Sequence, residues 1–205
     1  LELVMAVNHV APALLFDRLH PALRAAKADG GARVVLTSSE AQNAARVPGG
    51  GRAASDWERL MKTSGTTNAI GVYGLSKLSN VMMALEAQRR FSEVDGITAN
   101  ALAPSARTRM TEQAFADKMA TQEAAFDVMD PANVAPTVVW LGSADSGHVT
   151  GCVFELEGGK IMLEDGWREG PFVDQQARWE PAQVGGVVER LLAQRVAPRK
   201  VWGTA

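Results

Sequence analysis

The sequence predicts an α/β protein, in which helices cover both faces of a mainly parallel sheet. Short apolar runs at 32–39, 96–104 and 151–159 are typical of buried strands. Helical patterns alternate with these runs, and such alternation indicates parallel strands joined through helices. The chain has 205 residues, of which 46% are hydrophobic and 21% charged, so it is long enough for one domain with a core.

The first predicted helix begins near residue 4. Apolar residues recur at near-helical intervals at Val4, Val7, Val10, Leu14, Leu15 and Leu19. Pro12 predicts a kink or a later helix start, and the paired glycines of "LRAAKADGG" end the pattern. A polar, Gly-rich loop with one short helical patch, "DWERLM", is expected over 40–70, and a loop this long is usually functional or mobile.

Further helices are expected after this loop. The helix that begins near Tyr73 has an apolar stripe formed by Leu75, Leu78, Met82 and Leu85. A surface helix is expected over 109–126, and Asp130 is a good N-cap before Pro131. We expect an irregular segment at 160–181 and a last amphipathic helix at 182–194. Residues 1–157 are expected to form part of one domain, and 158–205 an extension that packs on it.

Composition excludes several classes of protein. A net charge of −2 gives no support for nucleic acid or an anionic membrane as a partner. No apolar run approaches the roughly 20 residues that span a bilayer, and the N-terminus does not resemble a signal peptide. The single cysteine, Cys152, excludes an internal disulfide, so we expect a cytoplasmic protein. The three histidines have no metal-site spacing, and "PGGGR" at 48–52 lacks the flanking strand and helix of a phosphate loop.

Polar residues follow two of the predicted strands. Ser38 and Ser39 end the first strand, and "APSART" ends the second. Tyr73 begins the helix that the chain enters after the first of these ends. Because ligands bind beyond the carboxyl ends of parallel strands, we expect these groups to gather at one edge of the sheet.

Tyr73 and Lys77 are suited to proton transfer. A free tyrosine, with a pKa near 10, is a poor base at neutral pH. A lysine four residues further on lies one helical turn away, and its charge stabilises the phenolate, as does the positive end of the helix. The pair therefore predicts general acid–base catalysis, such as the exchange of a hydroxyl proton when an alcohol is oxidised.

The segments "AVNHV", "VVLTSS", "YGLSK" and "NALAPSARTRMT", in this order, resemble the short-chain dehydrogenase/reductase family. The resemblance implies a Rossmann-type doubly wound sheet and NAD or NADP as cofactor. It covers almost the whole chain, but only the later part of the family's domain. The segments "LAPSARTRMTEQ", "VAPTVVWLGSAD" and "TGCVFELEGGKI" resemble the (3R)-hydroxyacyl-CoA dehydrogenase unit of type-2 multifunctional β-oxidation enzymes.

The resemblance implies a role for each site residue. Tyr73 is the acid/base, Lys77 also holds the nicotinamide ribose, and Asn8 organises a water relay to Lys77. Ser39 bonds the substrate oxygen, with Ser38 as the alternative. The residues implied to lie at the nicotinamide end of the cofactor are Pro104, Ser105 and Thr108, although Ser105 stands where the family normally has glycine.

The family's Gly-rich cofactor loop has no counterpart in these residues. We therefore expect an N-terminal half outside this numbering, or else a truncated chain with a raw sheet edge. The expected substrate is a 3-hydroxyacyl or 3-oxoacyl thioester such as an acyl-CoA. A sterol or retinoid is the first alternative, because the insertion before "YGLSKLSNVMMALEAQRR" resembles retinol-dehydrogenase-type members. A non-catalytic oligomerisation module is the second, and a homodimer or homotetramer is expected through the helix that carries Tyr73 and Lys77.

Overall fold

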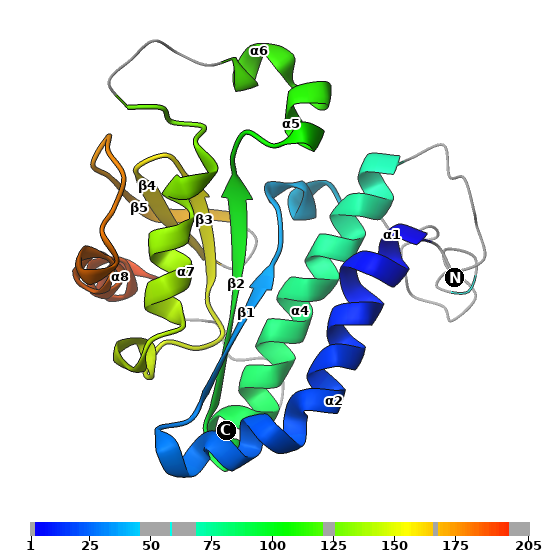
Figure 1. Cartoon of the computed structure of the whole chain (residues 1–205), viewed down its shortest axis with the longest axis vertical. Coiled ribbons are helices and arrows are strands. Elements are labelled where there is room, and N and C mark those ends of the chain that lie inside the picture. Colours follow the sequence, from blue (N-terminus) through cyan, green and yellow to red (C-terminus); the bar gives the residue numbers. More distant parts are fainter. Residues whose placement is uncertain (1–2, 46–57, 59–68, 121–125, 166–167, 197–205) are drawn as a thin grey trace.

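The computed structural model of the chain describes all residues except 1–2, 46–57, 59–68, 121–125, 166–167 and 197–205. Its centre is a five-stranded sheet whose strands follow one another in chain order (Figure 1). The strands are β1 (Ala32–Thr37), β2 (Ile97–Ser105), β3 (Val153–Glu157), β4 (Lys160–Asp165) and β5 (Arg168–Asp174). β1, β2 and β3 are parallel, whereas β4 and β5 are antiparallel to their neighbours.

The expectation of an irregular segment after β3 was wrong. A hairpin through Gly158 and Gly159 leads directly into β4, with Glu157 opposite Lys160. Gly158 adopts a φ of +56°, which suits glycine in a tight hairpin turn. The apolar run of β4 is only Ile-Met-Leu, too short to indicate a strand by itself, yet all three side chains are buried.

Helices cover both faces of the sheet (Figure 1). One layer contains a nearly continuous helical rod and α4 (Ala69–Asp95). The rod comprises α1 (Leu3–Met5), the π-helical turn η1 (Ala6–Val10), α2 (Ala11–Ala25) and the 3-10 turn η2 (Ala26–Asp29). The other layer contains α7 (Ala135–Leu141) and α8 (Pro181–Gln194). This arrangement confirms the predicted Rossmann-type α/β class.

Short helical segments connect the main elements. These are η3 (Glu40–Ala44), α5 (Arg109–Ala114), α6 (Ala116–Met119), η5 (Pro131–Asn133) and η6 (Ala144–Ser146). The single helix expected over 109–126 is broken at Phe115, whose backbone leaves the helical region between α5 and α6. The predicted cap is confirmed, because the Asp130 carboxylate accepts a hydrogen bond from the Ala132 N–H at 2.9 Å. "DWERLM", except Glu58, and "PGGGR" lie outside the described residues.

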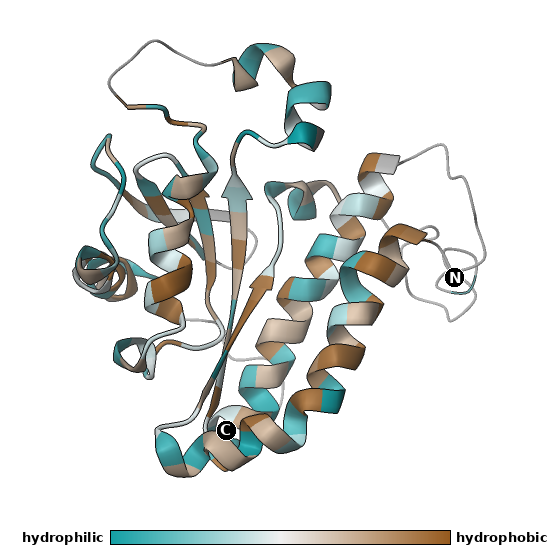
Figure 2. Ribbon diagram, in the orientation of Figure 1, coloured by the Kyte–Doolittle hydropathy of each residue, from teal (hydrophilic) through white to brown (hydrophobic). Residues whose placement is uncertain are grey.

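The main core lies between the sheet and the α7–α8 layer. Its buried members include Trp140 on α7, Phe154 on β3 and Leu191 on α8. Trp179 packs there as well, and its indole N–H donates to the Gly159 carbonyl at 2.7 Å. This core therefore joins residues on both sides of the predicted boundary after residue 157. The hydropathy colouring shows β1 as hydrophobic and α5 as largely hydrophilic (Figure 2).

The face of α4 that packs against the sheet differs from the predicted stripe. Val81 and Ala84 lie in a second buried cluster with Leu36 of β1 and Ala101 of β2. Met82 is 53% exposed and Leu85 is 39% exposed. Small residues allow the helix to approach the strands closely, so much of the leucine and methionine stripe faces away from the sheet.

Candidate active site

Tyr73 and Lys77 lie in the first turns of α4. The start of this helix lies at the same end of the molecule as the carboxyl end of β2 (Figure 1). The Lys77 ammonium nitrogen is 5.5 Å from the centre of the Tyr73 ring. Both side chains are half-buried. The helical spacing predicted from the sequence therefore places a cation against the face of the only tyrosine in the chain.

The Lys77 ammonium group also reaches the sheet. Its Nζ donates to the carbonyl oxygen of Thr37, the last residue of β1, at 3.3 Å. Burial lowers the pKa of Lys77 from its ordinary value of 10.5, because removal from water disfavours the charged form. Among the described residues, this bond uses one of the three ammonium N–H groups, which leaves two that could bind hydroxyl groups of a ligand.

Lys77→Met is expected to raise the free energy of unfolding near neutral pH by about 1 kcal/mol or less, because it removes a partly buried charge. The folded-state pKa lies below 10.5. The unfolded chain therefore binds more protons between the two pKa values, and the penalty disappears as pH rises through this window. Urea unfolding at neutral pH and near pH 10.5 measures this trend. A variant that is less stable at neutral pH would show that contacts of Lys77 outweigh its burial cost.

Asn8 lies in the π-helical turn η1, where the Ala11 N–H bonds to the Ala6 carbonyl. Its Nδ2 donates to the Ser76 hydroxyl at 3.1 Å, and that hydroxyl donates to the Tyr73 carbonyl at 2.7 Å. A π turn inside a helix is rare and is frequent at functional sites. The structure therefore connects Asn8 with the backbone of Tyr73 through Ser76, a buried residue that the sequence analysis did not single out.

The two serines after β1 have different surroundings. Ser38 is buried, and its hydroxyl lies 2.8 Å from the Gln42 side-chain oxygen and 3.0 Å from the Lys77 carbonyl. Ser39 is half-buried and begins η3, where its oxygen accepts from the Ala41 N–H at 3.3 Å. The Ser38 hydroxyl thus connects the end of β1 with α4. The Ser39 hydroxyl accepts a hydrogen bond, so its own O–H group could still donate one to a ligand.

Alanine substitutions of the two serines are expected to separate structure from catalysis. Ser38→Ala should lower the free energy of unfolding by about 1–3 kcal/mol, because it removes a buried hydrogen-bonding group. Ser39→Ala should leave stability within about 0.5 kcal/mol but lower turnover by about 10²-fold. Thermal unfolding and steady-state kinetics of both variants measure the difference. The reverse pattern would assign the substrate bond to Ser38.

The residues predicted for the nicotinamide end lie at the same edge of the sheet. Pro104 and Ser105 are the last residues of β2, and both are half-buried. Thr108 is exposed and caps α5, where its hydroxyl accepts from the Thr111 N–H at 3.2 Å. Among the described residues, Thr108 forms its hydrogen bonds with Thr111 and Glu112 and not with α4. Pro104, Ser105 and Thr108 therefore lie at the sheet edge that also carries the Tyr73–Lys77 pair.

The segment that carries Thr108 is fixed at its base. Arg107 donates to both carboxylate oxygens of Asp127 at 2.8 Å and to the Met119 carbonyl at 2.7 Å. The guanidinium group lowers the pKa of Asp127, and the carboxylate raises that of Arg107. Lys118 pairs with Glu157 at the end of β3 at 3.0 Å. These bonds position α5 and α6 beyond the carboxyl end of β2 (Figure 1).

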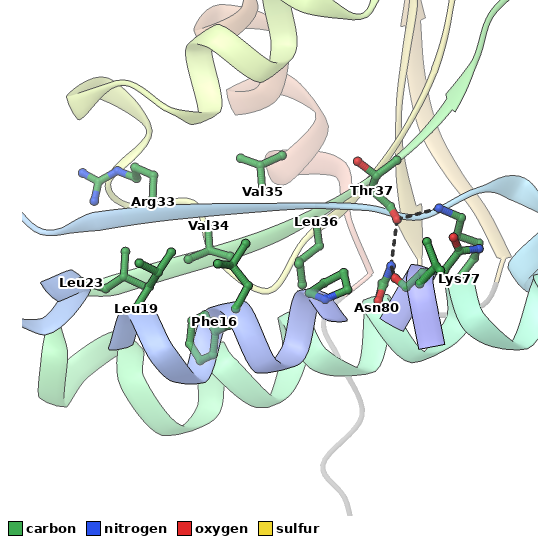
Figure 3. Close-up of a pocket in the computed structure, with 14 residues that line it drawn as sticks. Phe16, Leu19, Leu23, Arg33, Val34, Val35, Leu36, Thr37, Lys77 and Asn80 are labelled. Atoms are coloured by element: carbon green, nitrogen blue, oxygen red, sulfur yellow. Dashed lines mark hydrogen bonds between the residues drawn. The ribbon is translucent and has the colours of Figure 1, made fainter. Parts of the chain in front are cut away.

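A cavity of about 510 Å³ lies between α2 and β1 (Figure 3). Leu15, Phe16 and Leu19 line its α2 side, and the residues of β1 from 33 to 37 line the opposite side. Asn8, Lys77 and Asn80 also line this cavity, whereas Tyr73 and Ser39 do not. The cavity therefore meets the candidate site on its Lys77 side, along the strand that ends the described sheet.

The remaining candidates have structural contacts. His9 bonds Asn80, His20 bonds Asp95 and His148 bonds Glu189. Among the described residues, His, Cys, Asp and Glu side chains form no group of three that could hold a metal ion. Burial raises the pKa of the Cys152 thiol, which disfavours its reactive thiolate form. Within the part of the chain that the structure describes, no helix combines the length and apolar character needed to cross a membrane.

The parallel strands, the covering helices and the Tyr73–Lys77 pair define a Rossmann-type protein with a candidate acid–base site. No protein-family model matches the sequence. The hydroxyacyl-CoA dehydrogenase ChsB1 of Mycobacterium tuberculosis is 27% identical over 143 residues, which are 67% of this chain and 45% of that protein. This relative agrees with the resemblance of the sequence motifs to a hydroxyacyl-CoA dehydrogenase unit.

Solved structures extend the comparison. A short chain dehydrogenase from Mycobacterium avium is 34% identical, with a TM-score of 0.53 over 98% of this chain and 59% of that one. Another from Salmonella enterica serovar Typhi is 26% identical, with a TM-score of 0.51 over 74% of this chain and 50% of that one. The resemblance to short-chain dehydrogenases is thereby confirmed. The chain spans between 45% and 59% of the lengths of these proteins.

Proposed function

We propose that this chain carries the acid–base half of an NAD- or NADP-dependent short-chain dehydrogenase/reductase that interconverts a secondary alcohol and a ketone. The observation that carries the proposal is the Lys77 ammonium group held 5.5 Å from the Tyr73 ring. A half-buried cation stabilises a phenolate more strongly than an exposed one, because screening by water is weaker. Because the relatives are longer than this chain, the activity is proposed for the protein as a whole.

The donor groups of the site fit a nicotinamide ribose. Lys77 has N–H groups to spare for vicinal hydroxyls, and its ammonium group is fixed through Thr37. Pro104, Ser105 and Thr108 would lie toward the nicotinamide ring. A bound nicotinamide cofactor would supply or accept the hydride.

Tyr73 would move the matching proton. In the reducing direction, its hydroxyl gives a proton to the developing alkoxide, while Lys77 stabilises the phenolate that remains. In the oxidising direction, the phenolate takes the proton of the alcohol. Ser39 would donate a hydrogen bond to the substrate oxygen, and Asn8 would support proton return to Lys77 through water.

The substrate we propose is a 3-hydroxyacyl or 3-oxoacyl thioester. Support comes from the relative named as a hydroxyacyl-CoA dehydrogenase and from the matching motifs after β2. A steroid or retinoid substrate remains the first alternative, although most of the insertion that suggested it lies outside the described residues.

Assembly through α4 is a further part of the proposal. Met82 and Leu85 are exposed on α4, as an interface between two copies in a homodimer or homotetramer would require. If the protein were only an oligomerisation module, this surface would still be needed, whereas Tyr73, Lys77 and Ser39 would not.

Turnover assays separate these functions. The purified protein is incubated with NADH or NADPH and either acetoacetyl-CoA or a 3-ketosteroid, and loss of the reduced cofactor is followed by absorbance. We expect oxidation with acetoacetyl-CoA. Activity with the steroid alone would favour the first alternative. No oxidation with any pair, together with a defined dimer or tetramer in light scattering, would favour the oligomerisation module.

A further inference from the structure

Asn80 lies at the point where three elements of the candidate site meet. It is on α4, three residues after Lys77, and only 3% of it is exposed. Its Nδ2 donates to the carbonyl of Asn8 at 2.9 Å and to the carbonyl of Thr37 at 3.0 Å. Its Oδ1 is 3.0 Å from Nδ1 of His9. One side chain therefore joins α4, the π turn and the end of β1.

These contacts fix the orientation of the Asn80 amide. Backbone carbonyls only accept hydrogen bonds, so the NH₂ group must face Asn8 and Thr37. The Oδ1 atom can only accept, so Nδ1 of His9 must carry a proton. The flipped amide would set Oδ1 against two carbonyl oxygens. Asn80 thus has one orientation, and its two N–H groups are used within the site.

The carbonyl oxygen of Thr37 connects Asn80 with Lys77. The N–H groups of Ala32 and Ser38 donate toward β2, to Gly96 and Leu102. Since backbone groups alternate along a strand, those of Thr37 face the opposite edge. The Thr37 carbonyl accepts there from both Asn80 and Lys77, as Figure 3 shows. The amide therefore holds the same oxygen that holds the ammonium group.

We propose that Asn80 is a positioning residue of the acid–base site: its amide holds the Thr37 and Asn8 carbonyls so that Lys77 is aimed at Tyr73. The proposal rests on the proposed function for its catalytic meaning. The titratable groups that face this amide and Lys77 among the described residues are Tyr73 and His9. Because both N–H groups of the amide bond to backbone carbonyls, the role we assign to Asn80 is to position Lys77 and not to react.

The first test compares Asn80→Ala with Ser79→Ala. Ser79 is the adjacent buried polar residue of α4, and within the described part of the chain its hydroxyl bonds only inside the helix, to the Leu75 carbonyl at 2.9 Å. Asn80→Ala should lower kcat with acetoacetyl-CoA by about 10²-fold while KM stays within about 3-fold, because Lys77 loses its alignment. Ser79→Ala should keep kcat within about 3-fold. Equal losses in kcat, or normal kcat in Asn80→Ala, would overturn the proposal.

The second test does not depend on turnover. In nitrogen-detected NMR of the unmodified protein, neutral His9 should be the Nδ1–H tautomer. In Asn80→Asp, the new carboxylate should move the titration of the Lys77 ammonium group to higher pH by about one unit. An Nε2–H tautomer of His9, or a Lys77 titration that does not move, would overturn the proposal. A protein that fulfils both expectations but reduces no ketone would contradict the proposed function and not the placement of Asn80.

Discussion

Tyr73→Phe is expected to lower kcat by about 10²–10⁴-fold while leaving the fold intact. The substitution removes only the phenol oxygen, which is the group that would exchange the proton. The contact of Lys77 is with the face of the ring, and phenylalanine keeps that face. The Ser76 hydroxyl bonds the backbone carbonyl of residue 73, so this bond survives as well. Loss of activity can therefore be assigned to the missing hydroxyl.

The decisive measurement is single-turnover reduction of acetoacetyl-CoA, together with thermal unfolding of both proteins. The melting temperature of Tyr73→Phe should stay within about 2 °C of the parent, because no buried polar group is left without a partner. The oligomeric state in light scattering should also be unchanged. If Tyr73→Phe retains near-normal turnover, another group moves the proton and the mechanism proposed for this site is wrong.

Much of the sheet and of the Tyr73–Lys77 pair could be predicted from local sequence. β1, β2 and β3 are continuous apolar runs, and such runs have few alternatives inside a chain of alternating helices. The i, i+4 spacing on a helix fixes which side chains meet before any tertiary contact is known. The Asp130 cap is local in the same sense. These features were predictable because their geometry is set within a few residues.

Features that depend on distant contacts were not predictable. β4 is a strand because β3 and β5 pair with it, although its own apolar run is very short. The π turn closes a hydrogen bond over five residues instead of four, and its sequence, Ala-Val-Asn-His-Val, could equally form an ordinary α-helical turn. In the sequence, Asn80 cannot be distinguished from an ordinary polar residue of a helix, because its partners lie in the π turn and at the end of β1. Buried polar networks need the whole fold to be specified.

Phe154→Ala is expected to cause the largest loss of stability of any single change considered. Phe154 lies on β3 with 0% exposure, and it stands opposite Leu102 of β2 and Leu163 of β4. Truncation of a fully buried phenylalanine costs about 3–5 kcal/mol, because the lost apolar burial is accompanied by a cavity. Domains of this kind are stable by about 5–15 kcal/mol, so the variant should be strongly destabilised.

Phe172→Ala is the matched control for this change. Phe172 is on β5 and is 59% exposed, with Lys160 placed 4.7 Å above its ring. Its truncation should cost about 1 kcal/mol or less, since little burial and one exposed cation–π contact are lost. Urea unfolding of both variants gives the two free energies. Similar losses would place the main core elsewhere. A much larger loss for Phe154 would confirm that the core joining β2, β3 and β4 carries much of the stability of the sheet.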